Sequence, residues 1–152
     1  MKVFSFILIL LIFVLLVSCS RTFNGLIRNG TNQSATIDVY LIRKNKMHSL
    51  PNQVRVGKYL ENFKKKDLDS VNSIDTVDWI DLNHFRYTIR PRSVLLLKDL
   101  GIKLVNGLVF SDVIAVFKSG GQTDSIKAGW RAWDQFKNVN GILCYDIKNG
   151  SR

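Results

Sequence analysis

The sequence contains few residues of the kinds that catalytic and metal sites use. Its 152 residues include only two cysteines and two histidines. The motifs H-E-x-x-H, C-x-x-C and G-x-S-x-G are absent, and so is a phosphate-binding glycine loop. Because a zinc site needs three or four ligands, we interpret His48 and His84 as exposed or hydrogen-bonded residues. We therefore expect no catalytic residues, no metal and no cofactor.

Aspartates gather in one stretch of the sequence without forming a pattern that predicts a hydrolase. They are Asp67, Asp69, Asp75, Asp78 and Asp81. A hydrolase pair needs two carboxyl groups at a set separation in space, which neighbouring positions in the sequence do not establish. We interpret these aspartates as an acidic loop facing basic neighbours, and we rank a lipid-anchored hydrolase last among the candidate functions.

The sequence also lacks an apolar run long enough to cross a bilayer as a helix. Residues 3–17, which are apolar except for Ser5, form its longest run and would cover about 22 Å against a hydrocarbon layer of about 30 Å. Lys2 precedes this run, and the small residue Ser18 and then Cys19 follow it. This order is typical of a secretory signal segment, which does not belong to the fold.

Residues 16–19, Leu-Val-Ser-Cys, resemble the lipobox of bacterial lipoproteins. The resemblance implies that residues 1–18 are a cleaved signal peptide and that Cys19 carries fatty acyl chains such as palmitate. Residues 19–22 would then be a lipid-anchored tether, and residues 23–152 suit a single domain. An uncleaved membrane anchor, in which Cys19 is incidental, is the alternative.

With Cys19 consumed by lipid, Cys144 has no partner for an internal disulfide. It lies in the mainly apolar segment 141–147, so we expect a strand near the chain end with Cys144 as a small buried hydrophobe. The domain must therefore close its core without a covalent link, and its aliphatic and aromatic content allows this.

Acidic residues are scarce relative to basic ones. The formal net charge is +10, and the leader holds only one of the charged residues, Lys2. Such a chain attracts anionic partners, among which lipid head groups, cell-wall polymers and acidic protein faces fit an exported protein better than nucleic acid. A solvated basic face would account for much of the same excess.

Two-residue alternation dominates the sequence after residue 35 and predicts strands. Ile37, Val39 and Leu41 alternate with polar positions, and Phe85, Tyr87 and Ile89 do the same. Further strands are expected over residues 23–28, 94–97, 103–105, 108–117, 126–133 and 142–147. Glycine-rich turns separate many of them, a pattern that favours a β-sandwich or barrel.

One segment departs from this alternation. Residues 56–68 place Tyr59, Leu60, Phe63 and Leu68 near one side of a helix, with three lysines largely on the other. We expect a short amphipathic helix against the sheets. Residues 75–82 remain open between a helix turn and a strand.

Residues 129–133, Gly-Trp-Arg-Ala-Trp, are the most conspicuous aromatic cluster. In a strand, Trp130 and Ala132 would point one way while Arg131 and Trp133 point the other. We expect Trp130 in the core, with Trp133 either in the core or on the surface beside Arg131. Since tryptophan and arginine are common anchors at protein interfaces, Arg131 and Trp133 are candidate anchors.

Several segments together resemble the outer-membrane lipoprotein family of type VI secretion systems. Besides the lipobox, they are residues 37–42, a strand; residues 57–63, in a helical insertion; residues 113–117, an aliphatic strand; and the pair Trp130-Arg131. The resemblance implies a transthyretin-like or immunoglobulin-like β-sandwich with a short helical insertion. It also implies a structural, non-enzymatic role in an envelope-spanning secretion apparatus.

In that family the lipid fixes the protein to the outer membrane, and the domain in the periplasm binds the periplasmic part of a large inner-membrane protein. Oligomers are expected only within that complex. The partner-binding loop corresponds here to Asn29, Gly30, Thr31, Asn32, Gln33 and Ser34. The alternative function is a stand-alone surface or periplasmic lipoprotein that binds an anionic ligand or polymer through its basic face.

Overall fold

Strands account for most of the residues that the computed structural model describes, which are 22–42, 52–105, 108–111 and 113–147. The strands are β1 (Thr22–Phe23), β2 (Gly25–Asn29), β3 (Ala35–Leu41), β4 (Gln53–Lys58), β5 (Ser73–Thr76), β6 (Asp78–Asp81), β7 (His84–Ile89), β8 (Ser93–Leu96), β9 (Ile102–Val105), β10 (Leu108–Ser111), β11 (Val113–Ser119), β12 (Gln122–Ile126), β13 (Lys137–Val139) and β14 (Ile142–Asp146). Three short 3₁₀ helices join them in this part of the chain: η2 (Lys65–Ser70), η3 (Leu97–Leu100) and η4 (Arg131–Gln135). The prediction of a mainly β chain is confirmed.

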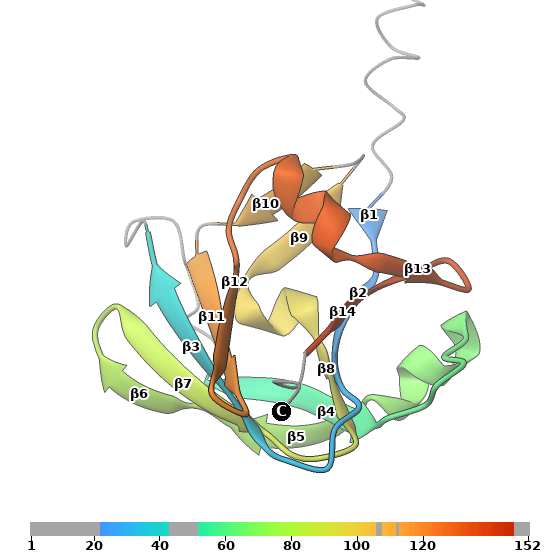
Figure 1. Ribbon diagram of the computed structural model, residues 1–152, viewed down its shortest axis with the longest axis horizontal. Helices are drawn as coiled ribbons and strands as arrows, with labels where there is room; N and C mark the ends of the chain where they lie inside the picture. Colours follow the sequence, from blue (N-terminus) through green and yellow to red (C-terminus); the bar gives the residue numbers. More distant parts are fainter. Residues whose placement is uncertain (1–21, 43–51, 106–107, 112, 148–152) are drawn as a thin grey trace, which may run out of the picture.

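The strands form two large sheets and one small one (Figure 1). The five-stranded sheet has the order β12-β11-β3-β7-β6, and the six-stranded sheet has the order β13-β14-β2-β8-β4-β5. The small sheet is β1-β9-β10. One core cluster contains residues of both large sheets, as a β-sandwich requires. A transthyretin-like or immunoglobulin-like classification stays a prediction.

Alternation in the five-stranded sheet follows the sequence pattern. Ile37 and Val39 of β3 and Phe85 and Ile89 of β7 are fully buried and face the main core. Since β3 pairs with both β7 and β11, it lies at the centre of this sheet. The pattern therefore identified the strands that form one wall of the core.

The six-stranded sheet is covered on both faces. Every residue of β2 is buried, because Ile27 enters the main core while Leu26 enters a second cluster. That second cluster also contains Phe63 and Val71, which come from the segment between β4 and β5. Cys144 lies in it, fully buried, so the prediction of a buried cysteine is confirmed.

The expected amphipathic helix over residues 56–68 is wrong. Its first residues belong to β4, where Val56 pairs with Leu95 of β8 and with Ser73 of β5. Pairing with two neighbouring strands outweighs the local helical spacing, which is a weak preference. The helical part that does form is the 3₁₀ helix η2, displaced toward residue 70. Residues 75–82, left open by the sequence, contribute to β5 and β6.

Two further boundaries differ from expectation. The strand expected over residues 126–133 stops at Ile126, where β12 ends, and the helix η4 follows from Arg131. Gly129 between them has a φ of 133°, which residues with a side chain rarely adopt. Thr22, expected in the tether, already pairs with Val105 in β1.

No helix in the described ranges has the length and apolar character needed to span a membrane. Residues 1–21, which include the proposed signal peptide and Cys19, lie outside these ranges, as does His48.

The second core cluster generates a stability prediction. Phe63 is fully buried there, in a segment that was expected to be an amphipathic helix against the sheets. Replacing it by alanine (Phe63→Ala) should lower the free energy of unfolding by about 3–5 kcal/mol, the usual cost of deleting a buried aromatic ring. Urea unfolding would measure this. The control Leu60→Ala, at a position that is 37% exposed, should cost much less, and equal costs for both variants would contradict the second core.

Candidate partner-binding interface

The loop between β2 and β3 is held by the side chain of Asn29, which is fully buried. Its Nδ2 donates hydrogen bonds to the backbone oxygens of Gln33 at 2.8 Å and Arg90 at 3.0 Å. Its Oδ1 accepts from the Thr31 backbone N–H at 3.2 Å and lies 2.7 Å from Thr31 Oγ1. One asparagine thus fixes both the curvature of the loop and its position against the neighbouring turn.

The neighbouring turn, between β7 and β8, makes its own bonds to the loop. The Arg92 backbone N–H donates to the Thr31 oxygen at 3.2 Å, and Arg92 Nε donates to Asn32 Oδ1 at 3.2 Å. Asn32, Gln33 and Ser34 are exposed above this base. The loop predicted to bind a partner therefore presents polar side chains on a fixed backbone.

Tyr59 packs beneath the loop between two arginines. Its ring centre lies 5.7 Å from the Arg28 guanidinium and 5.9 Å from that of Arg92. A side-chain Cβ at Gly30 would lie 3.1 Å from this ring, closer than such contacts usually are. Gly30 therefore lets the ring reach the loop.

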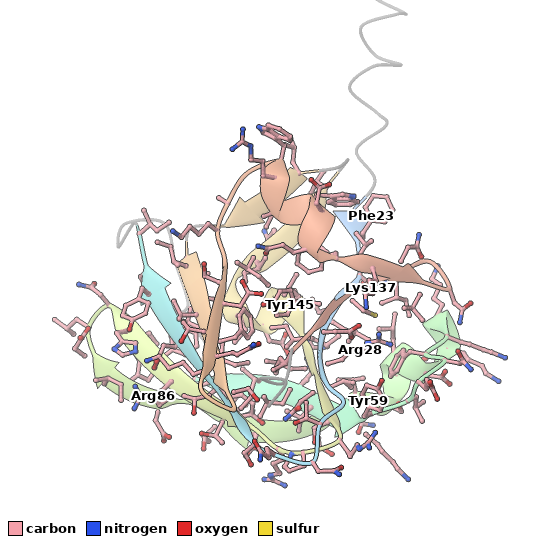
Figure 2. The ribbon with its side chains drawn as sticks, in the orientation of Figure 1. Phe23, Arg28, Tyr59, Arg86, Lys137 and Tyr145 are labelled. Atoms are coloured by element: carbon pink, nitrogen blue, oxygen red, sulfur yellow. The ribbon has the colours of Figure 1, made fainter. Side chains whose placement is uncertain are left out.

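Arg28 connects this cluster to the far end of the chain. Its guanidinium makes two bonds to the Asp146 carboxylate, at 2.6 and 3.0 Å, and Lys137 lies 3.5 Å from the same carboxylate. Burial lowers the pKa of Arg28 and is the largest single influence, but the hydrogen bond with Asp146 and the charges of neighbouring groups together outweigh it, so the net pKa is raised. Figure 2 shows Arg28, Tyr59 and Lys137 on one side of the molecule.

Next to the loop lies a basic hollow of about 450 Å³. Its lining comprises Lys58, Arg90 and Arg92 together with the hydroxyl residues Ser70, Ser73, Tyr87 and Ser93, and also Val56 and Gly57. Arg90 is paired with Asp75 at 3.1 Å, whereas Lys58 and Arg92 form no ion pair with another described residue. Cations and hydroxyl donors together suit an anionic group or an acidic protein face.

A second charged cluster lies on the outer face of the five-stranded sheet. Asp38 of β3 is fully buried under three partners: Arg86 at 2.7 Å, Lys118 at 2.9 Å and His84 at 3.0 Å. Figure 2 shows Arg86 on the side away from Arg28. Burial raises the pKa of Asp38, but the hydrogen bonds from these three partners together lower it by more than burial raises it. The net pKa is therefore well below the ordinary value of 3.8.

His84, expected to be either exposed or hydrogen-bonded, is hydrogen-bonded. His84 contacts Asp38, and its ring stacks on Tyr40 with the ring centres 4.3 Å apart. No group of three or more potential metal ligands occurs within the described ranges. In the fold, His84 thus has both a hydrogen-bond partner and a stacking partner.

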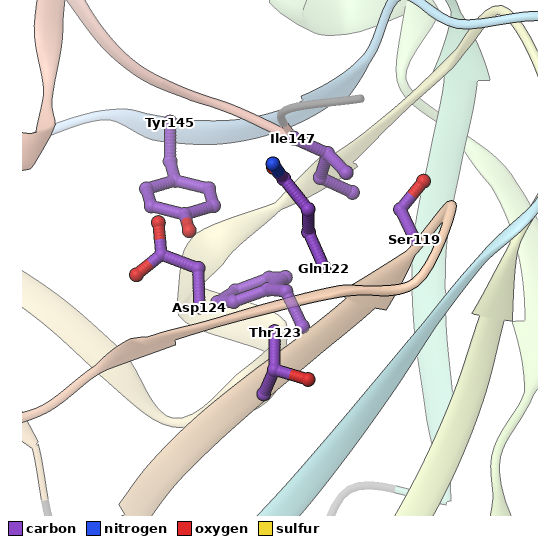
Figure 3. Close-up of a pocket in the computed structure, with 7 residues that line it drawn as sticks. Ser119, Gln122, Thr123, Asp124, Tyr145 and Ile147 are labelled. Atoms are coloured by element: carbon purple, nitrogen blue, oxygen red, sulfur yellow. The ribbon is translucent and has the colours of Figure 1, made fainter. Parts of the chain in front are cut away.

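A polar pocket of about 400 Å³ opens at the β11–β12 hairpin (Figure 3). Phe117, Ser119, Gln122, Thr123, Asp124, Tyr145 and Ile147 line it. The Tyr145 phenol points toward the Asp124 carboxylate in Figure 3. Burial, and to a smaller extent a hydrogen bond with Asp124, raises the pKa of Tyr145. Among the described residues, this lining contains no histidine, lysine or cysteine.

The expectation that Trp130 lies in the core is wrong, whereas Trp133 takes the core position, one of the two alternatives left open for it. Trp130 is 64% exposed, with the Arg131 guanidinium 5.1 Å from its ring centre. Trp133 packs edge-on against Phe23 at 5.4 Å and joins the main core. Because these residues form a 3₁₀ helix rather than a strand, alternation does not assign their faces. The exposed pair is Trp130 and Arg131.

Comparison with protein-family models, curated proteins and solved structures finds no significant match. The structure brings Asn29 and Thr31 together as the base of the loop and leaves Arg131 and Trp133 apart from it, on η4. Sequence reasoning missed Tyr59 and Arg92 as loop neighbours. The isolated Gly30, which marks a close backbone approach, was the available signal for Tyr59.

Asp38 generates a prediction about pH. Because its folded pKa lies below the unfolded value of 3.8, its contribution to stability is complete above that pH and is lost as the pH falls toward the folded pKa. Asp38→Asn should cost about 2 kcal/mol at neutral pH, since Arg86 and Lys118 stay partly hydrated. Urea unfolding at about pH 6 would measure this cost, and urea unfolding at about pH 3 would measure the stability that is lost in acid.

On acidification, the Asp38→Asn variant should lose less of its free energy of unfolding than the wild type does. The exposed aspartate Asp69 supplies the control, because Asp69→Asn should lose as much stability in acid as the wild type. Equal acid losses in all three proteins would contradict the assignment.

Proposed function

We propose that this protein is a lipid-anchored, non-enzymatic component of a type VI-like secretion apparatus at the outer membrane. Its β2–β3 loop binds the periplasmic part of a large inner-membrane protein. The observation that carries this proposal is the Asn29 network, which holds the exposed residues of that loop in one conformation. A loop fixed before binding loses little conformational entropy on binding.

The charge around the loop supports an acidic partner surface. Lys58 and Arg92 form no ion pair with another described residue, and the Arg90 side chain is largely exposed although it pairs with Asp75. Charge complementarity steers encounter and selects partners more than it adds affinity. The partner is therefore expected to carry an acidic patch opposite this loop.

The direction of the loop also fits an anchored protein. In Figure 1, β1 lies at one end of the domain, and the bends that join β2 to β3 and β7 to β8 lie at the other. With a lipid on Cys19, three residues before β1, the loop is carried away from the membrane and toward a periplasmic partner.

The basic hollow favours a second candidate function, in which a stand-alone lipoprotein binds an anionic ligand or polymer. Its cations and hydroxyl groups would contact sulfate, phosphate or carboxylate groups. Such binding would weaken steeply with added salt and would need no second protein.

The anchor predicts a thiol count. Burial raises the pKa of Cys144 to about 11, so the folded chain should not react with a thiol reagent near neutral pH. With Cys19 acylated, unfolding should release one reactive thiol per chain. Cells fed labelled palmitate should label the wild type, while the Cys19→Ala variant stays unlabelled. Two thiols on unfolding, together with an unlabelled wild type, would rule the anchor out.

The loop predicts a charge-dependent interaction. Arg92→Glu reverses the charge beside Asn32, so co-purification of the large membrane protein after cross-linking should fall about tenfold or more, the cost of about 1.4 kcal/mol. Lys66→Glu makes the same charge change on η2, at an exposed position, and should leave recovery unchanged. Equal recovery of the partner with both variants, or recovery of the lipoprotein alone, would favour the second candidate.

A further inference from the structure

The end of the domain that carries β1 has an exposed aromatic residue among cations. β1, β9, β10 and η4 lie together at this end (Figure 1). Trp133 of η4 packs on Phe23 of β1 at 5.4 Å, and Val109 of β10 pairs with Gly129 just before η4. These contacts hold η4, and with it the 64% exposed Trp130, at the same end of the domain as β1.

The surroundings of Trp130 are basic with some exposed apolar surface. Arg131 lies against its ring, and Lys127 lines the same hollow of about 360 Å³. Lys103 of β9 pairs with Phe110, two residues after Leu108 on β10, so Lys103 and Leu108 lie on one face of the small sheet; Lys103 is exposed and Leu108 is 38% exposed. Lys103, Lys127 and Arg131 form no ion pair with another described residue, and Asp134 is the one acidic residue of η4. We call these five residues, Lys103, Leu108, Lys127, Trp130 and Arg131, the Trp130 surface.

The length of chain before β1 limits how far the Trp130 surface can stand from a membrane. Cys19 and the largely apolar segment 3–17 both precede Thr22, the first residue of β1. Three residues span at most about 11 Å when fully extended. An acylated Cys19, or an uncleaved anchor ending near it, therefore keeps β1 within about one tether length of the bilayer.

We propose that the Trp130 surface is a membrane-contact site that rests on the head groups of an anionic phospholipid bilayer. The inference rests on the membrane anchoring in the proposed function. The indole of Trp130 lies at head-group depth, a position that tryptophan favours because its ring is apolar and its N–H is polar. Lys103, Lys127 and Arg131 meet lipid phosphates, and Leu108 reaches the apolar boundary beside them.

A bilayer fits this surface better than a second protein for a structural reason. The tether brings the membrane to this end of the domain at a high effective concentration, whatever else the protein binds. Weak contacts that would not hold a free protein are then enough to orient an anchored one. Docking here turns the β2–β3 loop away from the bilayer, since the two lie at opposite ends in Figure 1.

The test uses the acylated full chain reconstituted into vesicles of phosphatidylcholine and phosphatidylglycerol, with or without bromine on the acyl chains. Flotation of the vesicles reports the anchor, and quenching of tryptophan emission by bromine reports the depth of the indole. Wild-type emission should fall in brominated vesicles, and Trp130→Phe should remove most of that fall. Trp79→Phe, on β6, is the matched control and should leave the quenching in place.

A charge test accompanies the depth measurement. The double variant Lys127→Glu/Arg131→Glu should reduce quenching in these vesicles, whereas Lys65→Glu/Lys66→Glu on η2 should not. These variants leave the tryptophans in place, so they also cover the case in which Trp130→Phe fails to fold.

The outcomes separate the two proposals. Protein that floats but shows no quenching that depends on Trp130 overturns the membrane-contact site alone and indicates that this surface faces water or another protein. Protein that fails to float overturns the anchor and the contact site together. Quenching that survives the Lys127→Glu/Arg131→Glu change overturns the role of the lipid phosphates.

Discussion

Burial of β2 on both faces is the constraint on which the other features depend. Ile27 points into the main core and Leu26 into the second cluster, so the strand cannot shift by one residue without exchanging the two. Its neighbours in the sheet are β14, near the chain end, and β8. β1 directly precedes it, and Asn29, its last residue, holds the loop. One strand of five residues therefore sets the positions of both the proposed membrane-contact site and the proposed partner-binding loop.

The sequence predicts most where a pattern is local. Alternation located β3 and β7, and short apolar runs located β8 and β14, because one or both faces of these strands are buried. The sequence pattern failed over residues 56–68, where the helical spacing of apolar residues competes with the strand pairing of Val56 to Leu95 and Ser73. It also failed near Trp130, because a short 3₁₀ helix has neither the period of a strand nor that of an α-helix.

The candidate site was less predictable, because its parts meet across long stretches of chain. The partner-binding role of the loop was predicted from a family resemblance. The position of the loop, however, depends on a hydrogen bond from the Asn29 side chain to the Arg90 backbone oxygen, 61 residues later. Asp38 looked like a solvent-facing residue of β3. Its burial depends on Arg86 and Lys118, which lie 48 and 80 residues further along the chain. No spacing rule connects residues so distant, so only the folded sheet brings these charges together.

The enclosure of Cys144 has a consequence for the environment in which the protein works. With its pKa near 11, about one side chain in ten thousand is a thiolate at neutral pH, and that one is surrounded by aliphatic and aromatic groups. Oxidants and thiol oxidoreductases need an accessible thiolate, so the folded domain offers them no substrate. An exported chain with this fold would be vulnerable to wrong intermolecular bridges only during the interval before β14 closes the sheet.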